Sequence, residues 1–564
     1  MSGRVFKELL LILVIGSFIG LLMAVIANQF VLGVQFAKEV RESSQWLEFN
    51  LPWGRYSLAP VVFLTGAALA VVWLRKLLRL TAWAGPADSI YAAHAPHHEL
   101  NLKQGAASTL AAFISAAGGA SVGQYGPLVH FGATVGSGFR RVFKDFLSPD
   151  IFLGCGVAAA IAAGFNAPLA GVVFAHEAVL RHFSPRAIAP IFIASVSAST
   201  FDSLFFSATE KTFSLQQAVP PLAEVVPVLL LLAPFASLVA ISFMLALRST
   251  TALGKRLPMP ATSLTLLAAV ICGCVGVFMP QILGIGVDGI NMMIAGEADL
   301  SLLLALLLGK LTMTALCIGF GLFGGVFSPA LFVGVATGAI AAQVLASFGL
   351  VGMQEVISVA AMAAVSAAVI GAPITSVLIV LELTGSYEFA VAAMIAVIVC
   401  TLLTNRLFGQ SFFDRQLLDR GIDLRKGRES LALDGTRVGD YISAHFLTAA
   451  ASMSGQRLMQ AMAEGGFTEA YVVDPEGRLQ GKVSVFDCAQ ATDKPVSSCM
   501  DVNPLRFSET ESLTNAMHKV SRFVGESIPI LAEDSGRLLG VVTEGDLFQA
   551  VLKVQDSVRQ LERN

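Results

Sequence analysis

The most informative residues in this chain form two short glycine-rich segments, Gly123–Pro127 and Gly325–Pro329. Each interrupts apolar sequence and opens a new apolar stretch of helical length. The start of a helix carries unpaired backbone N–H groups and the positive end of the helix dipole. Hydrocarbon cannot satisfy those groups, so they must line a cavity or meet an anion. Two such helix starts in one chain suggest an anion pathway.

The two segments belong to an internal repeat. Glycines follow the proline of each segment at the same two offsets: Gly132 and Gly136, and Gly334 and Gly338. This small-xxx-small spacing permits close helix approach and is a packing signal. A second pair of blocks starts at residues 164 and 371, and each ends in a glutamate nine residues after a proline, Glu177 and Glu382. These paired blocks indicate two homologous halves, of a kind that membrane transporters often arrange as inverted repeats.

The elements that position these segments must lie in a membrane. The chain has 564 residues, of which 55% are hydrophobic and 14% charged, whereas about a quarter of the residues of a soluble protein are charged. Several segments are apolar enough and long enough to cross a hydrocarbon layer about 30 Å thick: residues 8–37, 58–80, 220–247, 262–283, 301–320 and 387–405. Shorter apolar stretches are broken by Gly and Pro, as expected where a binding site lies near the midplane.

Basic residues suggest the orientation. Arg4 and Lys7 precede the first apolar segment, which lacks a small-residue cleavage signature and is interpreted as a retained helix. The segment 406–428 after the last apolar helix is rich in Arg and Lys. By the positive-inside rule we expect both termini in the cytoplasm. The location is expected to be the inner or plasma membrane of the cell.

The composition changes near residue 425, where mixed charge and turn signals begin. Within this soluble part, residues 477–487 recur as residues 536–546, a shift of 59 residues. The first copy predicts helix, strand, turn, strand and helix over residues 455–464, 469–473, 475–478, 480–485 and 486–491. Two units of this size bury little alone and should pack on each other.

The ordered blocks resemble the CLC family of chloride channels and proton-coupled anion transporters. They read GQYGP (123–127), GFNAPLAGVVFAHE (164–177), GKLTMTALCIGFGLFGGVFSPALFVG (309–334), GAPITSVLIVLELTGS (371–386) and SFFDRQLLDRGI (411–422). The soluble repeat resembles paired cystathionine-β-synthase (CBS) domains. The resemblance implies an all-α membrane domain with an inverted repeat, followed by an α/β CBS pair, and a homodimer with one pore per subunit. The expected domains are residues 1–425, 436–495 and 496–554.

The resemblance also assigns an anion pathway. Backbone N–H groups of Val326 and Phe327, and those around Gln124, Tyr125 and Gly126, should face the anion. The family's first filter motif, glycine-serine-glycine-isoleucine-proline, is matched only by residues 83–87. There Ala84 replaces the serine that usually touches the anion, and Gly85 follows it. The pore tyrosine after the last helix aligns with Phe413, so a second hydroxyl donor is missing.

Two carboxylates used by the family's antiporters are also replaced. The external gating glutamate aligns with Tyr125, and the internal proton-transfer glutamate with Ala178. Tyr125 sits between glycines in the helix break, which favours a role as gate over simple packing. Glu177 is an obvious substitute proton carrier, but its symmetric partner Glu382 favours a repeated structural feature. Lys310 either adds positive potential to the pathway or snorkels, and the sequence does not separate the two.

Other candidate sites carry weaker signals. In CBS pairs that resemble this one, residues at Ser484, Asp487, Thr543 and Asp546 contact the ribose and phosphates of adenine nucleotides. Many such pairs are structural and bind nothing. No cofactor is therefore required, and an adenine nucleotide is one candidate. The cluster of His94, His97, His98 and Glu99 matches no standard ligand spacing, and the seven cysteines form no framework, so no metal site is predicted.

We therefore expect a transport protein and not an enzyme. Its substrate should be chloride or a similar small monovalent anion, because backbone amides select the sign of a charge and not its chemical identity. Conduction should be passive and uncoupled from protons, since tyrosine, with a reference pKa of about 10, is a poor proton carrier at neutral pH. The alternatives are a proton/anion antiporter with a rerouted proton path, and a membrane-anchored nucleotide sensor without transport. No nucleic-acid partner is expected.

Overall fold

The computed structural model describes residues 3–44, 47–52, 54–95, 100–140, 142–143, 147–206, 215 and 219–563. The chain divides into two compact units, and the boundary between them in the second half of the chain falls between Gly421 and Ile422. Each unit is described by itself.

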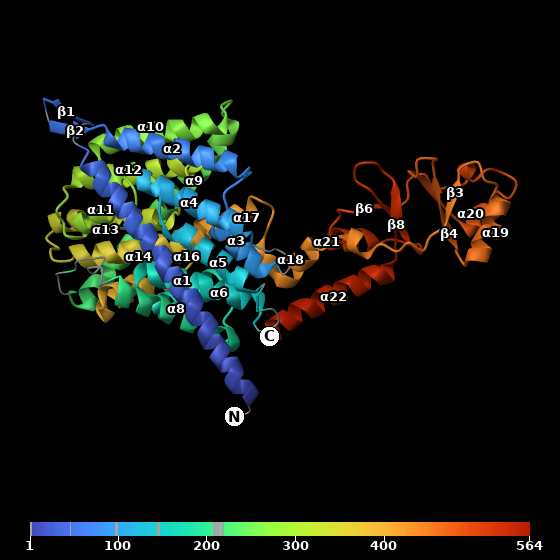
Figure 1. The fold of residues 1–564 in the computed structure, drawn as a ribbon, viewed down its shortest axis with the longest axis horizontal. Coiled ribbons are helices and arrows are strands. Elements are labelled where there is room, and N and C mark those ends of the chain that lie inside the picture. The colour runs from blue at the N-terminus through green and yellow to red at the C-terminus, as the bar shows by residue number, and fades with distance from the viewer. Residues whose placement is uncertain are drawn as a thin grey trace. The chain divides into compact units, whose positions relative to one another are not determined.

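The first unit is a bundle of helices (Figure 1). In its first half the helices are α1 (Gly3–Glu42), α2 (Ala59–Leu77), α3 (Pro86–His94), α4 (Leu102–Gly118), α5 (Tyr125–Arg140), α6 (Pro149–Phe165), α7 (Pro168–Phe174) and α8 (Pro185–Phe205). The second half contains α9 (Leu222–Arg256), α10 (Ala261–Phe278), α11 (Val287–Ile294), α12 (Leu300–Gly319), α13 (Phe327–Ser347), α14 (Gln354–Ile370), α15 (Pro373–Thr384), α16 (Tyr387–Leu407) and α17 (Phe412–Leu418).

Eight helices among the described residues are long and apolar enough to cross a membrane. All six segments predicted to span the membrane fall on such helices, which confirms a multi-pass membrane domain. Helices α8 and α13 are two further spans, which were not predicted because polar residues and prolines interrupt their apolar sequence. The all-α expectation misses one detail, because the antiparallel hairpin β1 (Glu48–Leu51) and β2 (Gly54–Ser57) joins α1 to α2.

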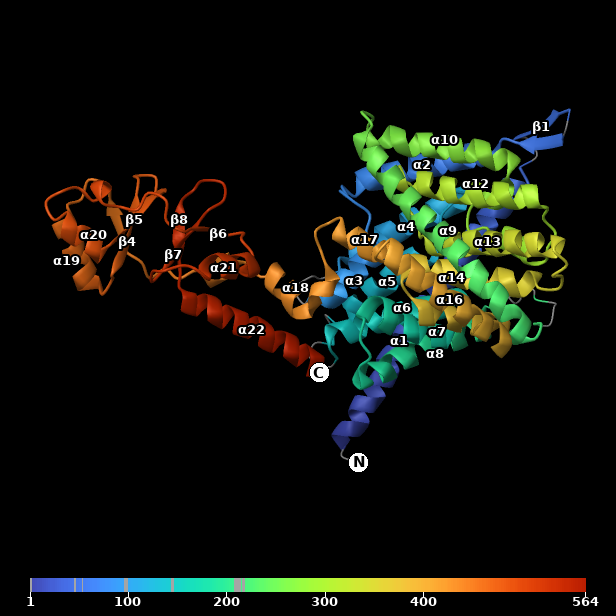
Figure 2. The same cartoon turned by 180° about the vertical axis from the view of Figure 1, so that it is seen from behind.

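The interior of this unit repeats the same helix pair. Helix α5 packs on α6 and α13 packs on α14, and α6 and α14 are buried along almost their whole length. Figures 1 and 2 show α2 and α10 at one end of the bundle, α6 and α8 at the other, and α13 and α14 between them. Glycines allow the two helices of each pair to pack closely. A Cβ at Gly136 would stand 2.0 Å from the carbonyl oxygen of Phe152, and one at Gly338 would stand 2.6 Å from that of Ile357. The packing interpretation of these glycines is confirmed.

The second unit contains two copies of one small fold. Its first α-helix is α18 (Gly427–Gly435). The first copy contains β3 (Thr448–Ala450), α19 (Gly455–Gly465), β4 (Glu469–Val473), β5 (Leu479–Ser484) and α20 (Val485–Gln490). The second contains β6 (Phe507–Ser508), α21 (Leu513–Val520), β7 (Ile528–Leu531), β8 (Leu538–Val542) and α22 (Glu544–Arg563). In each sheet the first two strands are parallel and the last two antiparallel. The element order predicted for the first copy is confirmed.

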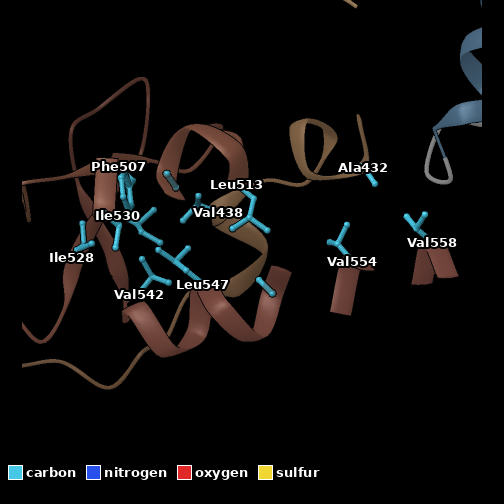
Figure 3. Close-up of a cluster of buried hydrophobic side chains, with 13 residues drawn as sticks. Ala432, Val438, Phe507, Leu513, Ile528, Ile530, Val542, Leu547, Val554 and Val558 are labelled. Atoms are coloured by element: carbon cyan, nitrogen blue, oxygen red, sulfur yellow. The ribbon is translucent and has the colours of Figure 1, made fainter. Parts of the chain in front are cut away.

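The two copies meet at equivalent residues. The N–H of Leu479 donates to the carbonyl of Gly536, and the N–H of Leu538 to that of Gly477, in a bridge between Arg478 and Arg537. These pairs are related by the shift of 59 residues. Each copy also has its own apolar core, and Figure 3 shows that of the second copy, where Phe507, Ile528, Ile530, Val542 and Leu547 face one another.

Candidate functional site

The two glycine-rich segments meet directly in the first unit. The N–H of Gly123 donates to the carbonyl of Gly325 at 2.7 Å, and the N–H of Gly325 donates to that of Gly123 at 2.6 Å. The two residues occupy equivalent positions in the repeat, so the reciprocal pair marks local two-fold symmetry. The contact needs glycine, because a Cβ at Gly325 would stand 2.9 Å from the backbone nitrogen of Gly126. The bridge therefore sets the starts of α5 and α13 against each other.

Both helix starts leave backbone N–H groups without an intrahelical acceptor. The first helical bonds run from Leu128 to the carbonyl of Gln124, and from Ala330 to that of Val326. The N–H groups of Tyr125 and Gly126, and of Phe327 and Ser328, precede these bonds. Together they form the two positive helix ends that the sequence predicted to face an anion. That these groups bind the anion stays a prediction.

Sequence reasoning missed one hydroxyl at this site. The buried Ser328 Oγ has no hydrogen-bond partner, and it lies 2.9 Å from where a Cβ at Gly123 would stand. A serine next to the bridge can donate to an anion, as the serine absent from position 84 would. The signal was present in the sequence, because Ser328 follows Phe327 within the second glycine-rich segment.

Tyr125 lies at this site within a group of aromatic rings. The residue is 7% exposed. Its ring stacks on Phe165 with the centroids 3.7 Å apart, and it meets the ring of Phe327 edge-on at 5.6 Å. Gly164 makes the stack possible, because a Cβ there would lie 2.9 Å from Cδ1 of Tyr125. The start of α5, the end of α6 and the start of α13 therefore meet at this ring.

The first filter segment lies beside the bridge, but its amides are already engaged. The N–H of Ala84 donates to Ser108 Oγ at 3.0 Å, and the N–H of Gly85 to Asp88 Oδ2 at 2.7 Å. Helix α3 begins at Pro86, whose Cγ would lie 3.4 Å from a Cβ at Gly126. As placed, Ala84 and Gly85 have no N–H free for an anion. Their assignment to the pathway stays a prediction that this geometry does not favour.

The helix start at Pro86 also favours a different alignment of the motif. If Pro86 takes the place of the motif's proline, the serine position moves from Ala84 to Trp83. The indole nitrogen of Trp83 is buried and has no hydrogen-bond partner. The predicted loss of the serine hydroxyl is unaffected. Phe413 is buried at the start of α17, where its ring meets that of Phe412, so its pathway role also stays a prediction.

The symmetric glutamates each cap the other half of the repeat. The carboxylate of Glu177 accepts hydrogen bonds from the N–H groups of Ile374 and Thr375, both at 2.8 Å. The carboxylate of Glu382 accepts from those of Leu169 and Ala170, both at 2.9 Å. Each acid thus neutralises the N-terminus of the opposite short helix, α15 or α7. The interpretation of the pair as a structural feature is confirmed. Ala178 is buried beside Glu177 in a π-helical turn, Ala175–Leu180.

The snorkelling alternative for Lys310 is wrong. Its side chain is fully buried in α12. The ammonium donates to the carbonyls of Ile282 and Gly284 at 3.0 and 2.8 Å, and lies 5.1 Å from the ring centre of Phe332. Snorkelling fails because these carbonyls satisfy the charge inside the bundle. Lys310 therefore holds the turn between α10 and α11.

The four candidate nucleotide contacts form two matching helix caps. Ser484 Oγ donates to Asp487 Oδ2 at 2.6 Å, and Thr543 Oγ1 to Asp546 Oδ2 at 2.8 Å. In both pairs the hydroxyl also accepts from the backbone N–H of the aspartate, and the carboxylate accepts from the backbone N–H of the Ser or Thr, which completes a capping box. Helix capping alone accounts for these residue types at these positions. A nucleotide contact stays a prediction.

A partly buried polar network joins the two copies of the soluble unit. Lys482 Nζ lies 2.7 Å from Glu469 Oε2 and donates to the carbonyl of Ser527 at 2.8 Å. Tyr471 Oη is 2.7 Å from Ser527 Oγ, and burial raises the pKa of Tyr471 well above its usual value. No group of three or more His, Cys, Asp or Glu suited to a metal occurs among the described residues. Residues 96–99 of the histidine cluster lie outside them.

Comparisons with known proteins agree with this architecture. A sequence model of the voltage gated chloride channel family matches residues 66–405, and one of the CBS domain matches residues 496–553. The putative chloride channel protein ClcB-like of Ralstonia nicotianae is 27% identical over 387 residues, covering 65% of this chain and 86% of the relative. The H(+)/Cl(-) exchange transporter ClcA of Vibrio parahaemolyticus is 29% identical over 327 residues, covering 55% and 68%.

Solved structures agree as well. A slow cyanobacterial Cl-/H+ antiporter superposes with a TM-score of 0.65 at 22% identity, covering 73% of this chain and 97% of that one. A eukaryotic CLC transporter superposes with a TM-score of 0.62 at 19% identity, covering 95% and 98%. These likenesses establish the fold. Because the family model spans more than half of the sequence, this chain belongs to the voltage gated chloride channel (CLC) family of membrane anion transport proteins.

Proposed function

We propose that this protein conducts chloride, or a similar small monovalent anion, passively and without proton coupling. The observation that carries the proposal is the pair of helix starts joined by the bridge between Gly123 and Gly325, with Tyr125 at the gate. The amides of α5 and α13 attract a negative charge without contributing a proton. The named relatives include an exchange transporter and a channel, so proton coupling depends on the residues of this chain.

Three residues argue against proton coupling. Tyr125 supplies a phenol and Ala178 a methyl group at the two positions where the family's antiporters have glutamates. Glu177 is adjacent to Ala178, but both of its oxygens accept hydrogen bonds from α15. The Glu177 carboxylate is therefore engaged as the cap of that helix.

One observation favours a second candidate, a proton/anion antiporter with a rerouted proton path. His176 lies in the π-helical turn, and its Nε2 is buried without a hydrogen-bond partner. Its Nδ1 lies 2.8 Å from the carbonyl oxygen of His182, which in turn is paired with Asp150. A buried histidine with one free nitrogen is chemically suited to carry a proton.

Purified protein in liposomes separates the candidates. An imposed chloride gradient should drive anion flux and should move no protons against their own gradient. A pH electrode and a chloride electrode record both fluxes in one vesicle preparation. Sustained proton pumping at a fixed ratio to chloride would refute uncoupled conduction. If that pumping disappeared in His176→Ala, the rerouted path would be supported.

The same proposal covers assembly and location. We place a homodimer in the inner or plasma membrane with both termini cytoplasmic, supported by the basic segment after α16 and the family resemblance. The CBS pair is proposed to modulate conduction. An adenine nucleotide is its candidate ligand, at the two capping boxes.

A further inference from the structure

We infer that a cavity at the C-terminal end of α1 is an additional binding site for a small monovalent anion, placed next to the gate. The cavity has a volume of about 320 Å³. The end of α1, the segment Pro280–Gly289 and Gln124 line it, and we call it the Arg41 cavity. The inference rests on the proposed function, because the anion it would hold is the transported one.

Arg41 is a buried charge that has no hydrogen-bonding partner among the described residues. The residue is 7% exposed. Among the described residues its guanidinium makes no hydrogen bond and has no carboxylate within ion-pair distance. Burying a charge is costly unless it is paired, so an unpaired buried arginine indicates a missing counter-charge. A guanidinium is weakly hydrated and presents several donors, which suits an anion that sheds water on entry.

The other charged residues at the cavity, Lys38, Asp288 and Glu42, carry a net formal charge of −1. Lys38 forms an ion pair with Asp288 and lies 4.0 Å from Glu42. The side chains of these two acids are 74% and 58% exposed, so solvent screens their charge. With Arg41 the formal charge of the four side chains sums to zero, but Arg41 is the buried member of the four.

Two further features add positive potential at the inner wall. Helix α11 starts at the cavity after Gly286, which provides no side-chain cap, and its first helical bond is made by the N–H of Ile290. Its earlier N–H groups therefore have no acceptor within the helix. The ammonium of Lys310 stands behind the same turn, 3.2 Å from where a Cβ at Gly286 would lie.

The cavity also adjoins the gate. Gln124 lines it, and the next residue in the chain is Tyr125. Gln124 is 4% exposed, and its Oε1 is buried without a hydrogen-bond partner. An anion bound at Arg41 would therefore lie close to Tyr125, the proposed gate. If the N-terminus is cytoplasmic, this cavity lies toward the outer face, since α1 crosses the membrane once.

Concentration-dependent flux tests the site. Chloride flux of the reconstituted full chain is measured across a range of chloride concentrations for the parent, Arg41→Gln and Arg41→Lys. Arg41→Gln should raise the half-saturating concentration by about tenfold, the ratio expected when one charged donor is lost, while flux at saturation persists. Arg41→Lys should give an intermediate shift. Arg248→Gln is the matched control, because Arg248 lies outside the cavity and pairs with Asp419.

A bromide soak gives a readout that does not depend on flux or on a variant. Anomalous diffraction from crystals of the parent protein should place a bromide ion against the Arg41 guanidinium. An unchanged half-saturating concentration in Arg41→Gln, or crystals with bromide at the filter and none at Arg41, would overturn the inference. If Arg41→Gln fails to fold, the bromide positions decide alone. Absence of flux in the parent would instead refute the proposed function.

Discussion

At the scale of single residues, Tyr125 combines two roles that mutation can separate. Its ring stacks on Phe165 and meets Phe327 edge-on, so we expect it to obstruct the space where the two helix starts meet. Its hydroxyl can donate to an anion, whereas a carboxylate would compete with the anion for the same amides. Tyr125→Ala should therefore raise chloride flux by removing the obstruction.

Tyr125→Phe should keep the obstruction and weaken chloride binding by about 1–3 kcal/mol. Flux and chloride affinity, measured for both variants in the same liposomes, test the two roles. Neither variant should acquire proton coupling. If both match the parent protein, Tyr125 serves packing alone and the gate lies elsewhere.

Residues that act through backbone geometry could be predicted from the sequence. Residues whose side chains lack a hydrogen-bond or ion-pair partner could not. Gly123 and Gly325 indicate a helix break by their type and spacing. The role of Glu177 followed from its repeat partner Glu382, because symmetry favours a structural explanation. The sequence does not show that Arg41 lacks a carboxylate partner for an ion pair, because that depends on which helices pack against the end of α1. The free hydroxyl of Ser328 is a tertiary property for the same reason.

At the scale of elements, the glycines between α5 and α6 set how closely the two helices pack. A Cβ at Gly136 would stand 2.0 Å from the backbone oxygen of Phe152 and 3.2 Å from Cα of Leu153. Backbone atoms cannot rotate away as a side chain can, so α6 would have to shift. Gly136→Ala should lower the stability of the membrane unit by about 1–3 kcal/mol. Thermal unfolding of the purified protein in detergent measures this loss.

Gly138 provides the control on the same helix. Among the described residues, no heavy atom lies within 4 Å of where a Cβ at Gly138 would stand, so Gly138→Ala meets open space. Alanine there should be neutral or stabilise the helix by up to about 1 kcal/mol. Equal effects of the two substitutions would show that backbone contact does not control the spacing of α5 and α6.

At the scale of the whole molecule, the membrane part and the soluble part of the chain were both predicted from the sequence. The change in composition was set near residue 425, and the compact membrane unit ends at Gly421. Helix α18 limits where a shortened chain can end. Ala432 belongs to the same apolar cluster as Val438 and Phe507, so α18 is part of the soluble core. A cut at residue 430 would divide that helix.

A chain ending after Lys426 should therefore still conduct anions. Every residue assigned to the filter and the gate lies before Gly421, and the reciprocal bonds of the filter and of Glu177 and Glu382 lie within the membrane unit. Removing the CBS pair deletes none of these contacts. Its flux in liposomes should be comparable to that of the intact protein, with any difference attributable to regulation. Size-exclusion chromatography must first show that both proteins have the same assembly state. A shortened protein that inserts and assembles normally but carries no anion would make the CBS pair an obligatory part of the conduction machinery.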